Sequence, residues 1–340
     1  MSSPVPDHRT PEFRDVTAET FRTDILPTAR PAILRGLVAD WPAVQAGRDS
    51  PEALADHIRG FDNGTPVRFT EGAPSIQGRF FYNDDLSGVN FDQREGTVAS
   101  VLDRLLTLQE DADPPAVAMQ SIPEPQALPG FARANPSPLL GEDVFPRLWI
   151  GNAATVHTHH DMNDNIACAV AGRRRVILFP PDQTRNLYIG PFERTPAGPP
   201  VSMVSVVEPD LERHPRFVEA WAAAEVADLE PGDALFIPSL WWHHVRATAS
   251  LSMLVNYWWD AGPAGAPSPF DAMVLSLAAL RGLPVERRRA WRAFYDHYVF
   301  EADEATHAHL PPNRRGVLGP LTPTTLDRIR RFVVAALSRR

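Results

Sequence analysis

The sequence predicts a mainly β protein whose strands occupy the middle of the chain, with helices on either side. Three observations lead to this prediction. Short aromatic or β-branched runs, separated by Gly, Pro or Asp, follow one another between residues 147 and 259. The 35 prolines are spread through turns and loops, which suits many short strands better than long helices. Beyond Asp260, apolar residues recur at spacings of three and four, which is typical of helices.

The N-terminal part predicts a few helices around one strand. Residues 1–12 look like a loose arm. Residues 17–26 begin with a Thr cap and carry the apolar spacing of a short helix, and residues 31–38 read as a strand. Two further capped helices are predicted over residues 50–61 and 97–110.

At least seven strands are predicted in the central region, and this number favours a sandwich or a barrel. Each run is rich in aromatic or β-branched residues and is bounded by turn-forming residues. The runs are RLWIGN (147–152), TVHTHHD (155–161), IACAVAG (166–172), RRVILFPP (174–181), DALFIPS (233–239), HHVRAT (243–248) and LSMLVNYWW (251–259).

The C-terminal part predicts three helices, over residues 269–282, 285–300 and 324–340. Two or three helices can hardly form a core alone, so their apolar faces must dock on the barrel or on another copy of the protein. We expect a homodimer formed through them, against the alternative that they pack within the chain. The expected division is a domain over residues 1–262 and a helical segment over residues 263–340.

The composition is that of an ordinary globular protein, with 44% hydrophobic and 22% charged residues among 340. No apolar run approaches the roughly 20 residues of a membrane-spanning helix, and the N-terminus lacks the apolar core of a signal peptide. A single cysteine, Cys168, rules out a disulfide framework and fits a reducing cytosol. We therefore expect a cytoplasmic protein with no membrane partner.

The charge balance argues against a role in binding nucleic acid. The net charge is −9, whereas sequence-independent nucleic-acid binding usually needs a basic face. All 33 basic residues are arginine and the chain has no lysine. Any site that would ordinarily use a lysine must therefore do without one.

One short stretch, HTHHDMNDN (157–165), is dense in groups that can bind a metal. Side chains at alternate positions of a strand share a face, so we expect His157, His159 and Asp161 to point one way and His160 the other. One strand rarely supplies every ligand. The best second donor is WWHH (241–244), because the PGD turn and Pro238 before it place this pair at a strand edge or mouth.

Two ligand sets are consistent with this spacing. Two His and one carboxylate on one face of a metal form the facial arrangement of non-haem Fe(II) oxygenases, which leaves positions open for a co-substrate and O₂. His157, His159 and a later His would instead form an all-nitrogen site, which is more typical of zinc. The spacing favours iron and leaves both sets open.

HHDMNDN, AGRRRVILFPPDQTRNLY, EPGDALFIPSLWWHHV and VNYWW, taken together, resemble the cupin-like Jumonji-C-type Fe(II)/2-oxoglutarate-dependent oxygenases. The resemblance extends upstream through RPAILRGLVADWPA and FFYNDD and downstream into YDHYVF. It implies a double-stranded β-helix (jelly-roll, cupin) core with flanking helices, and metal ligation by His159, Asp161 and His243. His157 is then a neighbour on the same face, while His160 and His244 have structural or supporting roles.

The resemblance also implies residues that bind 2-oxoglutarate. The family's basic residue, usually a lysine, falls on Arg174, and a guanidinium can grip a carboxylate through two parallel hydrogen bonds. The family's threonine three residues before the first ligand is replaced by Val156. The remaining residues that the resemblance places around the co-substrate are Tyr82, Asn165, Asn256 and Trp258.

The activity implied by the resemblance is hydroxylation of a C–H bond, with O₂ and 2-oxoglutarate consumed and succinate and CO₂ released. By resemblance alone we expect a protein or peptide side chain as substrate, and hydroxylation rather than demethylation. The insert PDLERHPRF (209–217) either shapes the mouth of the site or is a plain surface loop. Two alternatives are a cupin enzyme acting on a small molecule and a non-catalytic regulator that senses metal or 2-oxoglutarate.

Overall fold

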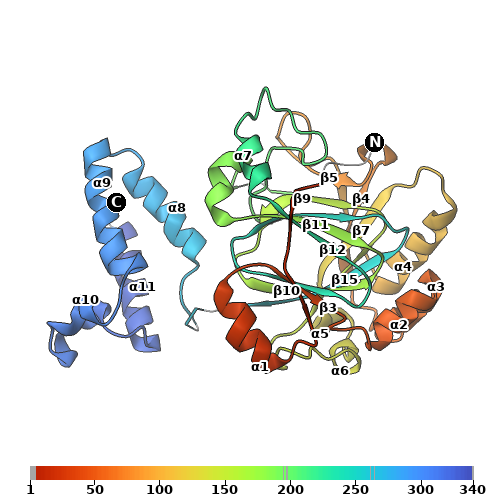
Figure 1. Cartoon of the computed structure of the whole chain (residues 1–340), viewed down its shortest axis with the longest axis horizontal. Helices are drawn as coiled ribbons and strands as arrows, with labels where there is room; N and C mark the ends of the chain where they lie inside the picture. Colours follow the sequence, from red (N-terminus) through yellow and green to blue (C-terminus); the bar gives the residue numbers. More distant parts are fainter. Residues whose placement is uncertain (1–4, 194, 197, 261, 264, 339–340) are drawn as a thin grey trace. The chain divides into compact units, whose positions relative to one another are not determined.

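The computed structural model describes residues 5–193, 195–196, 198–260, 262–263 and 265–338. The chain forms two compact units, Met1–Asp260 and Ala261–Arg340. The first unit contains two β-sheets, of six and nine strands, with short helices around them (Figure 1). The prediction of a mainly β fold with helices towards both ends is confirmed.

Eight consecutive strands build the core of the first unit. They divide between the two sheets, in the order β12-β11-β14-β9 in the smaller sheet and β13-β10-β15-β8 in the larger. Two facing four-stranded layers of this kind form the double-stranded β-helix that the sequence predicts. The strands are β8 (Arg147–Gly151), β9 (Thr155–His160), β10 (Asp164–Ala171), β11 (Arg174–Phe179), β12 (Glu225–Leu229), β13 (Ala234–Ile237), β14 (Trp242–Ala247) and β15 (Ser252–Trp259).

Strands from the N-terminal part extend both sheets. The larger sheet continues from β8 through β7 (Ala116–Pro123) and β4 (Val67–Gly72) to β6 (Asp92–Gly96), while β3 (Ala32–Arg35) pairs with β13. The smaller sheet ends at β5 (Arg79–Phe80), which runs parallel to β9. The segment DQREG of β6 carries no apolar alternation, so its pairing with β4 supplies a strand that its own pattern does not indicate.

The expectation of a loose arm over residues 1–12 is wrong for the described part of that segment. Strand β1 (His8–Arg9) pairs with β12, and β2 (Glu12–Arg14) pairs with β3, both in parallel. These edge strands are exposed, so no apolar pattern marks them. Ion pairs from Arg9 to Asp228 and from Glu12 to Arg35 accompany the backbone ladder.

Helices cover the outer face of the larger sheet (Figure 1). The apolar sides of α2 (Pro42–Asp49), α3 (Pro51–Arg59) and α4 (Val98–Thr107) join the side chains of that sheet in one buried cluster, which also holds Cys168. Ser50 caps α3 and Thr97 caps α4, each accepting a bond from a backbone N–H of the first turn.

Shorter helical segments complete the first unit. The segment predicted as one helix over residues 17–26 is divided into α1, a π-helix and a 3₁₀ turn. The bounds are α1 (Ala18–Thr20), η1 (Phe21–Ile25), η2 (Leu26–Thr28), η3 (Pro74–Ile76), η4 (Leu108–Glu110), α5 (Glu124–Ala127), α6 (Phe131–Ala134), η5 (Pro181–Leu187) and α7 (Phe217–Ala222).

The insert between β11 and β12 has two separate structural roles. Phe217, at the end of the PDLERHPRF segment, packs in a cluster with Phe179 and Trp242. Val201, earlier in the insert, bridges to His159, and Pro199 reaches the cavity between the sheets. The part of the insert that reaches the site is therefore the Pro199–Val201 segment, and not residues 209–217.

The second unit is helical, as the apolar spacing predicts. Its longer helices are α8 (Pro269–Leu280), α9 (Val285–Tyr295) and α11 (Pro323–Leu337), and the shorter segments are η6 (Asp296–Phe300), α10 (Ala305–Ala308), η7 (Pro312–Arg314) and η8 (Gly316–Leu318). None of the residues of α8 is buried, although nine of its twelve are apolar side chains of the kind that fill cores. Trp291, Phe294 and Phe332 are also exposed. Within the described residues, no helix has the length and apolar character needed to cross a membrane.

Candidate metal centre and cavity

Three side chains that can bind a metal converge where β9 and β14 lie side by side. His159 is near the end of β9, Asp161 follows the strand, and His243 pairs with His159 from β14. One ligand atom from each lies within 4.8 Å of the other two, and His243 Nε2 is 3.7 Å from Asp161 Oδ2. In the described part of the chain, no other group of three or more His, Cys, Asp or Glu side chains meets this spacing.

The backbone fixes the tautomer of both imidazoles. His159 Nδ1 lies 2.8 Å from the carbonyl oxygen of His157, and His243 Nδ1 lies 3.0 Å from that of Trp241. A carbonyl can only accept, so each Nδ1 carries the proton and each Nε2 presents a lone pair. Burial and the neighbouring His243 lower the pKa of His159, which favours the neutral ring that a metal requires.

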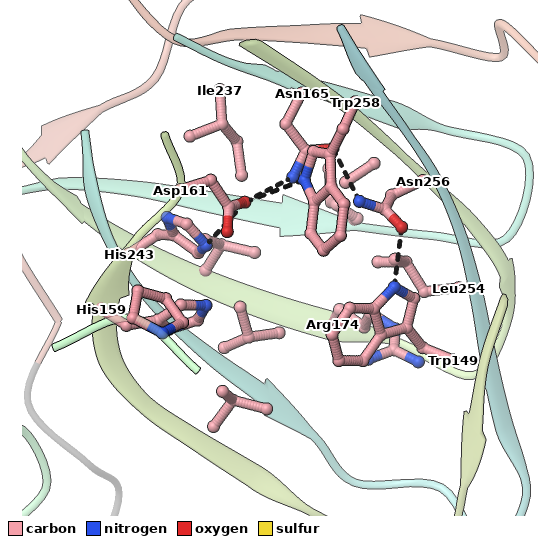
Figure 2. A pocket seen from close by; sticks show the side chains of 16 residues that line it. Trp149, His159, Asp161, Asn165, Arg174, Ile237, His243, Leu254, Asn256 and Trp258 are labelled. Atoms are coloured by element: carbon pink, nitrogen blue, oxygen red, sulfur yellow. Dashed lines mark hydrogen bonds and ion pairs between the residues drawn. The ribbon is translucent and has the colours of Figure 1, made fainter. Parts of the chain in front are cut away.

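A chain of hydrogen bonds holds the Asp161 carboxylate from behind (Figure 2). Asn165 Nδ2 and Trp258 Nε1 both donate to Asp161 Oδ2, at 3.0 and 3.1 Å. Asn256 Nδ2 donates to Asn165 Oδ1 at 3.3 Å, and Trp149 Nε1 donates to Asn256 Oδ1 at 2.7 Å. The Asp161 carboxylate can only accept hydrogen bonds, so Asn165 must turn its amide nitrogen towards it. This orientation in turn sets the direction of the bonds from Asn256 and Trp149. These donors keep Asp161 in one orientation.

Arg174 lies across the same cavity from the two histidines (Figure 2). Its Nη2 donates to Ser252 Oγ at 3.3 Å, while its Nε is buried without a hydrogen-bond partner. No ion pair links Arg174 to any of the described carboxylates, and burial lowers the pKa of the guanidinium to about 10. A buried cation without a counter-ion indicates a place for an anion.

The cavity lies between the two sheets and is mostly apolar. The groups that can bind a metal, His159, Asp161 and His243, lie at one end, and the Arg174 guanidinium lies at the other. A small molecule that binds a metal at the first end and places an anionic group at the second would span the cavity. The apolar lining consists of Val156, Ala167, Val176, Pro199, Leu229, Ile237, Val245 and Leu254.

A β-bulge removes His157 from the face of His159, and this corrects the expected alternation. Val156 pairs with Val245 and His159 pairs with His243, so two residues of β9 lie opposite His244 alone. His157 consequently lines a different hollow, where its ring stacks on Phe81 with centroids 4.0 Å apart. Its contribution to the metal centre is the backbone carbonyl that orients His159.

Tyr82 also lies outside the Arg174 cavity. It follows β5, the outer strand of the smaller sheet, and lines the same hollow as His157 and Arg79. The expectation that Tyr82 helps to bind the anion held by Arg174 is therefore not met by this arrangement. Its burial raises the pKa of the phenol. Val156, by contrast, does line the cavity, so an apolar side chain stands where a hydroxyl is usual in the resembled family.

The structure brings together the other residues singled out from sequence, Asn165, Asn256 and Trp258, and adds two that sequence reasoning missed. Trp149 and Ser252 each supply a polar atom to the site, to Asn256 and Arg174 respectively. Trp149 lies in the run RLWIG, where a tryptophan among apolar residues is an ordinary core choice. No local sequence pattern marks Trp149 as a site residue, because its hydrogen-bond partner, Asn256, is distant in sequence.

A double-stranded β-helix with two histidines and a carboxylate on its inner face defines a cupin-type protein with a candidate metal centre. The model of the cupin-like domain family matches residues 17–265. The chain therefore belongs to the cupin-like family of Jumonji-C-type proteins, as its motifs predict.

Several characterised proteins are similar to this chain over most of the first unit. Lysine-specific demethylase 8 of Danio rerio is 30% identical over 267 residues, which cover 76% of this chain and 61% of the relative. tRNA wybutosine-synthesizing protein 5 of Danio rerio is 29% identical over 272 residues, or 73% of this chain and 74% of the relative. HSPB1-associated protein 1 of Bos taurus is 27% identical and covers 71% of this chain and 50% of the relative. The chain thus spans less than two thirds of the first and third of these relatives.

Proposed function

We propose that the protein is an Fe(II)- and 2-oxoglutarate-dependent oxygenase that oxidises a C–H bond of a protein or peptide side chain. The observation that carries the proposal is a single cavity with a His–Asp–His group at one end and a buried guanidinium without a counter-ion at the other. 2-Oxoglutarate has matching ends, because its 2-oxo acid group can chelate a metal and its far end is a carboxylate.

His159, Asp161 and His243 are the proposed iron ligands. Two neutral imidazoles and one carboxylate on one side of an ion leave its other positions open, which is the arrangement of non-haem Fe(II) oxygenases. The donors on Asp161 Oδ2 and the carbonyls behind each Nδ1 orient these ligands before the ion arrives. This pre-orientation supports the proposal, since a chance cluster would not need it.

Arg174 is the proposed anchor for the far carboxylate of 2-oxoglutarate. Its planar guanidinium offers a pair of parallel N–H donors, and the apolar walls around it strengthen such a bond by excluding water. Ser252 Oγ accepts from Nη2 and keeps the side chain turned into the cavity. Asn165, Asn256 and Trp258 line the cavity between the two ends and act on the metal through Asp161.

When bound, Fe(II) and 2-oxoglutarate supply the oxidising chemistry, in which O₂ is consumed, succinate and CO₂ are released and one oxygen atom enters the substrate. The protein contributes position and a dry cavity. Trp258 and Trp149 cover one side of that cavity with their rings, which meet edge to face at 6.1 Å. A hydroxyl placed on an N-methyl carbon leads to loss of formaldehyde, so hydroxylation and demethylation share these steps.

The expectation of hydroxylation over demethylation finds no support among the relatives. Three of the similar proteins are called lysine-specific demethylases, and another is named for tRNA wybutosine synthesis. We therefore propose a C–H oxygenase whose product is either a hydroxylated or a demethylated side chain. The net charge of −9 supports a protein substrate over a nucleic acid.

We also propose that the second unit mediates homodimerisation. Helix α8 carries apolar side chains around most of its circumference, with Asp271 and Ser276 as its polar residues, and such a helix is normally largely buried. The exposed side chains of Trp291, Phe294 and Phe332 add to an apolar area larger than single surface residues would form.

The test of the catalytic proposal is turnover of 2-oxoglutarate without a prime substrate. With Fe(II), ascorbate and O₂, we expect slow formation of succinate by the wild-type chain and its loss in Asp161→Ala. Asp228→Ala, which removes a surface carboxylate paired with Arg175, is the matched control and should keep the activity. Absence of succinate formation by wild-type protein that binds Fe(II) and 2-oxoglutarate would support a sensing role and contradict the proposal.

A further inference from the structure

Arg147 lies beside the proposed active site but takes no part in it. Its cross-strand partner on β15 is Asn256, so its side chain is on the inner face of the larger sheet, next to the cavity. The guanidinium carbon lies 5.2 Å from the ring centre of Phe145 and 5.5 Å from that of Trp258. The first ring is 43% exposed, which places the group at the surface end of the site.

The group is close to the metal centre. The same Trp258 ring donates its Nε1–H to Asp161 Oδ2 at 3.1 Å. Arg147 and the proposed ligand are thus separated by a single indole ring. This separation corresponds to about three residues of extended chain, at roughly 3.4 Å per residue.

The arrangement fixes the plane of the guanidinium and leaves most of its edge free. Two aromatic rings hold it by cation–π contact, and Nη1 donates to Ser121 Oγ at 3.3 Å. Ser121 has a left-handed backbone, with φ of 56°, at a bulge in β7, and this conformation turns its hydroxyl to Arg147. A guanidinium has five N–H donors, and no ion pair joins Arg147 to a carboxylate among the described residues.

A fixed, half-buried cation of this kind selects for an anion. Its planar edge matches a carboxylate through two parallel bonds, and its partial burial strengthens that pairing relative to bulk water. A cationic side chain at the same place would be repelled. A phosphate would also bind, but a nucleic acid needs several basic contacts along its backbone, and one arginine on a chain of net charge −9 does not supply them.

We propose that Arg147 is a specificity-determining residue that binds an Asp or Glu side chain of a peptide substrate, within about three residues of the oxidised position. The inference rests on the proposed oxygenase function and names the substrate class for that same site. It makes the preferred substrate an acidic segment of protein.

The test uses pools of short degenerate peptides incubated with the full chain, Fe(II), 2-oxoglutarate and O₂. Mass spectrometry then identifies peptides that have gained oxygen or lost a methyl group. We expect Asp and Glu to be enriched at one position near the oxidised residue. From a charge-assisted bidentate contact we expect roughly a tenfold or greater preference in kcat/KM for Glu over Lys at that position.

Charge reversal separates recognition from a structural role. Arg147→Glu should invert the preference, so that Lys-containing peptides become better than their Glu counterparts, whereas a merely destabilised protein would lose both alike. Arg68→Glu, at an exposed position on β4, is the matched control and should keep the wild-type order. An unchanged order in Arg147→Glu would overturn the inference.

The outcomes for the wild-type chain distinguish this inference from the proposed function. Oxidation of peptides with no acidic preference overturns the inference alone. Succinate formation with no peptide oxidised overturns the inference and the proposed peptide substrate, but keeps the 2-oxoglutarate chemistry. Succinate formation stimulated by single-stranded RNA and not by peptides has the same consequence, in favour of a phosphate ligand. Failure to form succinate under any of these conditions contradicts the oxygenase proposal itself.

Discussion

The hydrogen bonds on Asp161 make a quantitative prediction about metal affinity. Trp258→Phe keeps an aromatic ring in the wall of the cavity but removes the Nε1–H that lies 3.1 Å from Asp161 Oδ2. A hydrogen bond to a charged group contributes about 1.5–3 kcal/mol. Asn165 still donates to the same oxygen at 3.0 Å, so the loss should fall at the lower end of this range. At about 1.4 kcal/mol per tenfold, we expect metal affinity to fall roughly tenfold.

The measurement is titration of the metal-free protein with Fe(II) under anaerobic conditions, or with Mn(II) as a redox-stable substitute. Trp41→Phe is the matched control, because Trp41 also donates its Nε1–H to an acceptor, the Pro136 carbonyl at 2.9 Å, but lies in the helical layer outside the sheet. Both variants should lose some stability, and only Trp258→Phe should lose metal affinity. Equal metal affinity in Trp258→Phe and wild type, with binding abolished by Asp161→Ala, would refute the proposed role of this hydrogen bond.

Three further predictions follow from the cavity, the bulge and the second unit. Arg174→Gln should weaken 2-oxoglutarate binding about a hundredfold, measured by calorimetry with Mn(II) present. The control is Arg173→Gln, which changes an exposed side chain paired with Glu230 and should leave the affinity unchanged. Equal effects of the two substitutions would contradict the anchor role of Arg174. Burial and Arg79 lower the pKa of His157 to about 4 in the folded protein. As the pH falls, the histidine of the unfolded chain is therefore protonated first. The contribution of His157 to the stability of the metal-free protein is complete above about pH 6.5 and declines towards pH 4. Denaturant unfolding should show that decline. His157 contributes at most about 2 kcal/mol of it by pH 5, because the buried His159 and His244 also have lowered pKa values and add their own shares. The decline should be smaller in His157→Gln by this share, and an identical pH profile in the variant would rule the histidine out. A chain ending at Asp260 should be monomeric by light scattering while the full chain is dimeric, and a monomeric full chain would refute the dimer.

Much of the core could be predicted because its signals are local. Strands β8 to β11 and β13 to β15 are short apolar runs bounded by turn residues. This pattern can be recognised in the sequence without knowing how the strands pair. The strands β4, β5, β7 and β12 were not predicted. Nor were β1, β2 and β6, which are polar or exposed and form only because a neighbouring strand offers free backbone groups. Their existence depends on the partner, which local periodicity does not describe.

The candidate site also contains residues that could be predicted from sequence and residues that could not. His159, Asp161 and His243 could be selected from sequence because their residue types, with the motifs around them, are specific. Within GRRRV, however, three successive arginines are equivalent by composition. Pairing of Arg174 with Ala247, two residues beyond Val245, is what turns that one side chain into the cavity and leaves Arg173 and Arg175 to ion pairs outside it.

By itself the sequence determined the fold class, the three candidate ligands and the absence of a lysine for the anchor position. Only the tertiary structure decided that His157 leaves the site, that Tyr82 lies in another hollow, and that Trp149 and Ser252 complete the polar contacts. The physical reason is that alternation of side chains along a strand predicts which residues share a face only where the hydrogen bonding to the neighbouring strand is regular. A bulge or a shift in register depends on the strand opposite, and at β9 the single extra residue across from His244 moves a histidine to the other side of the sheet.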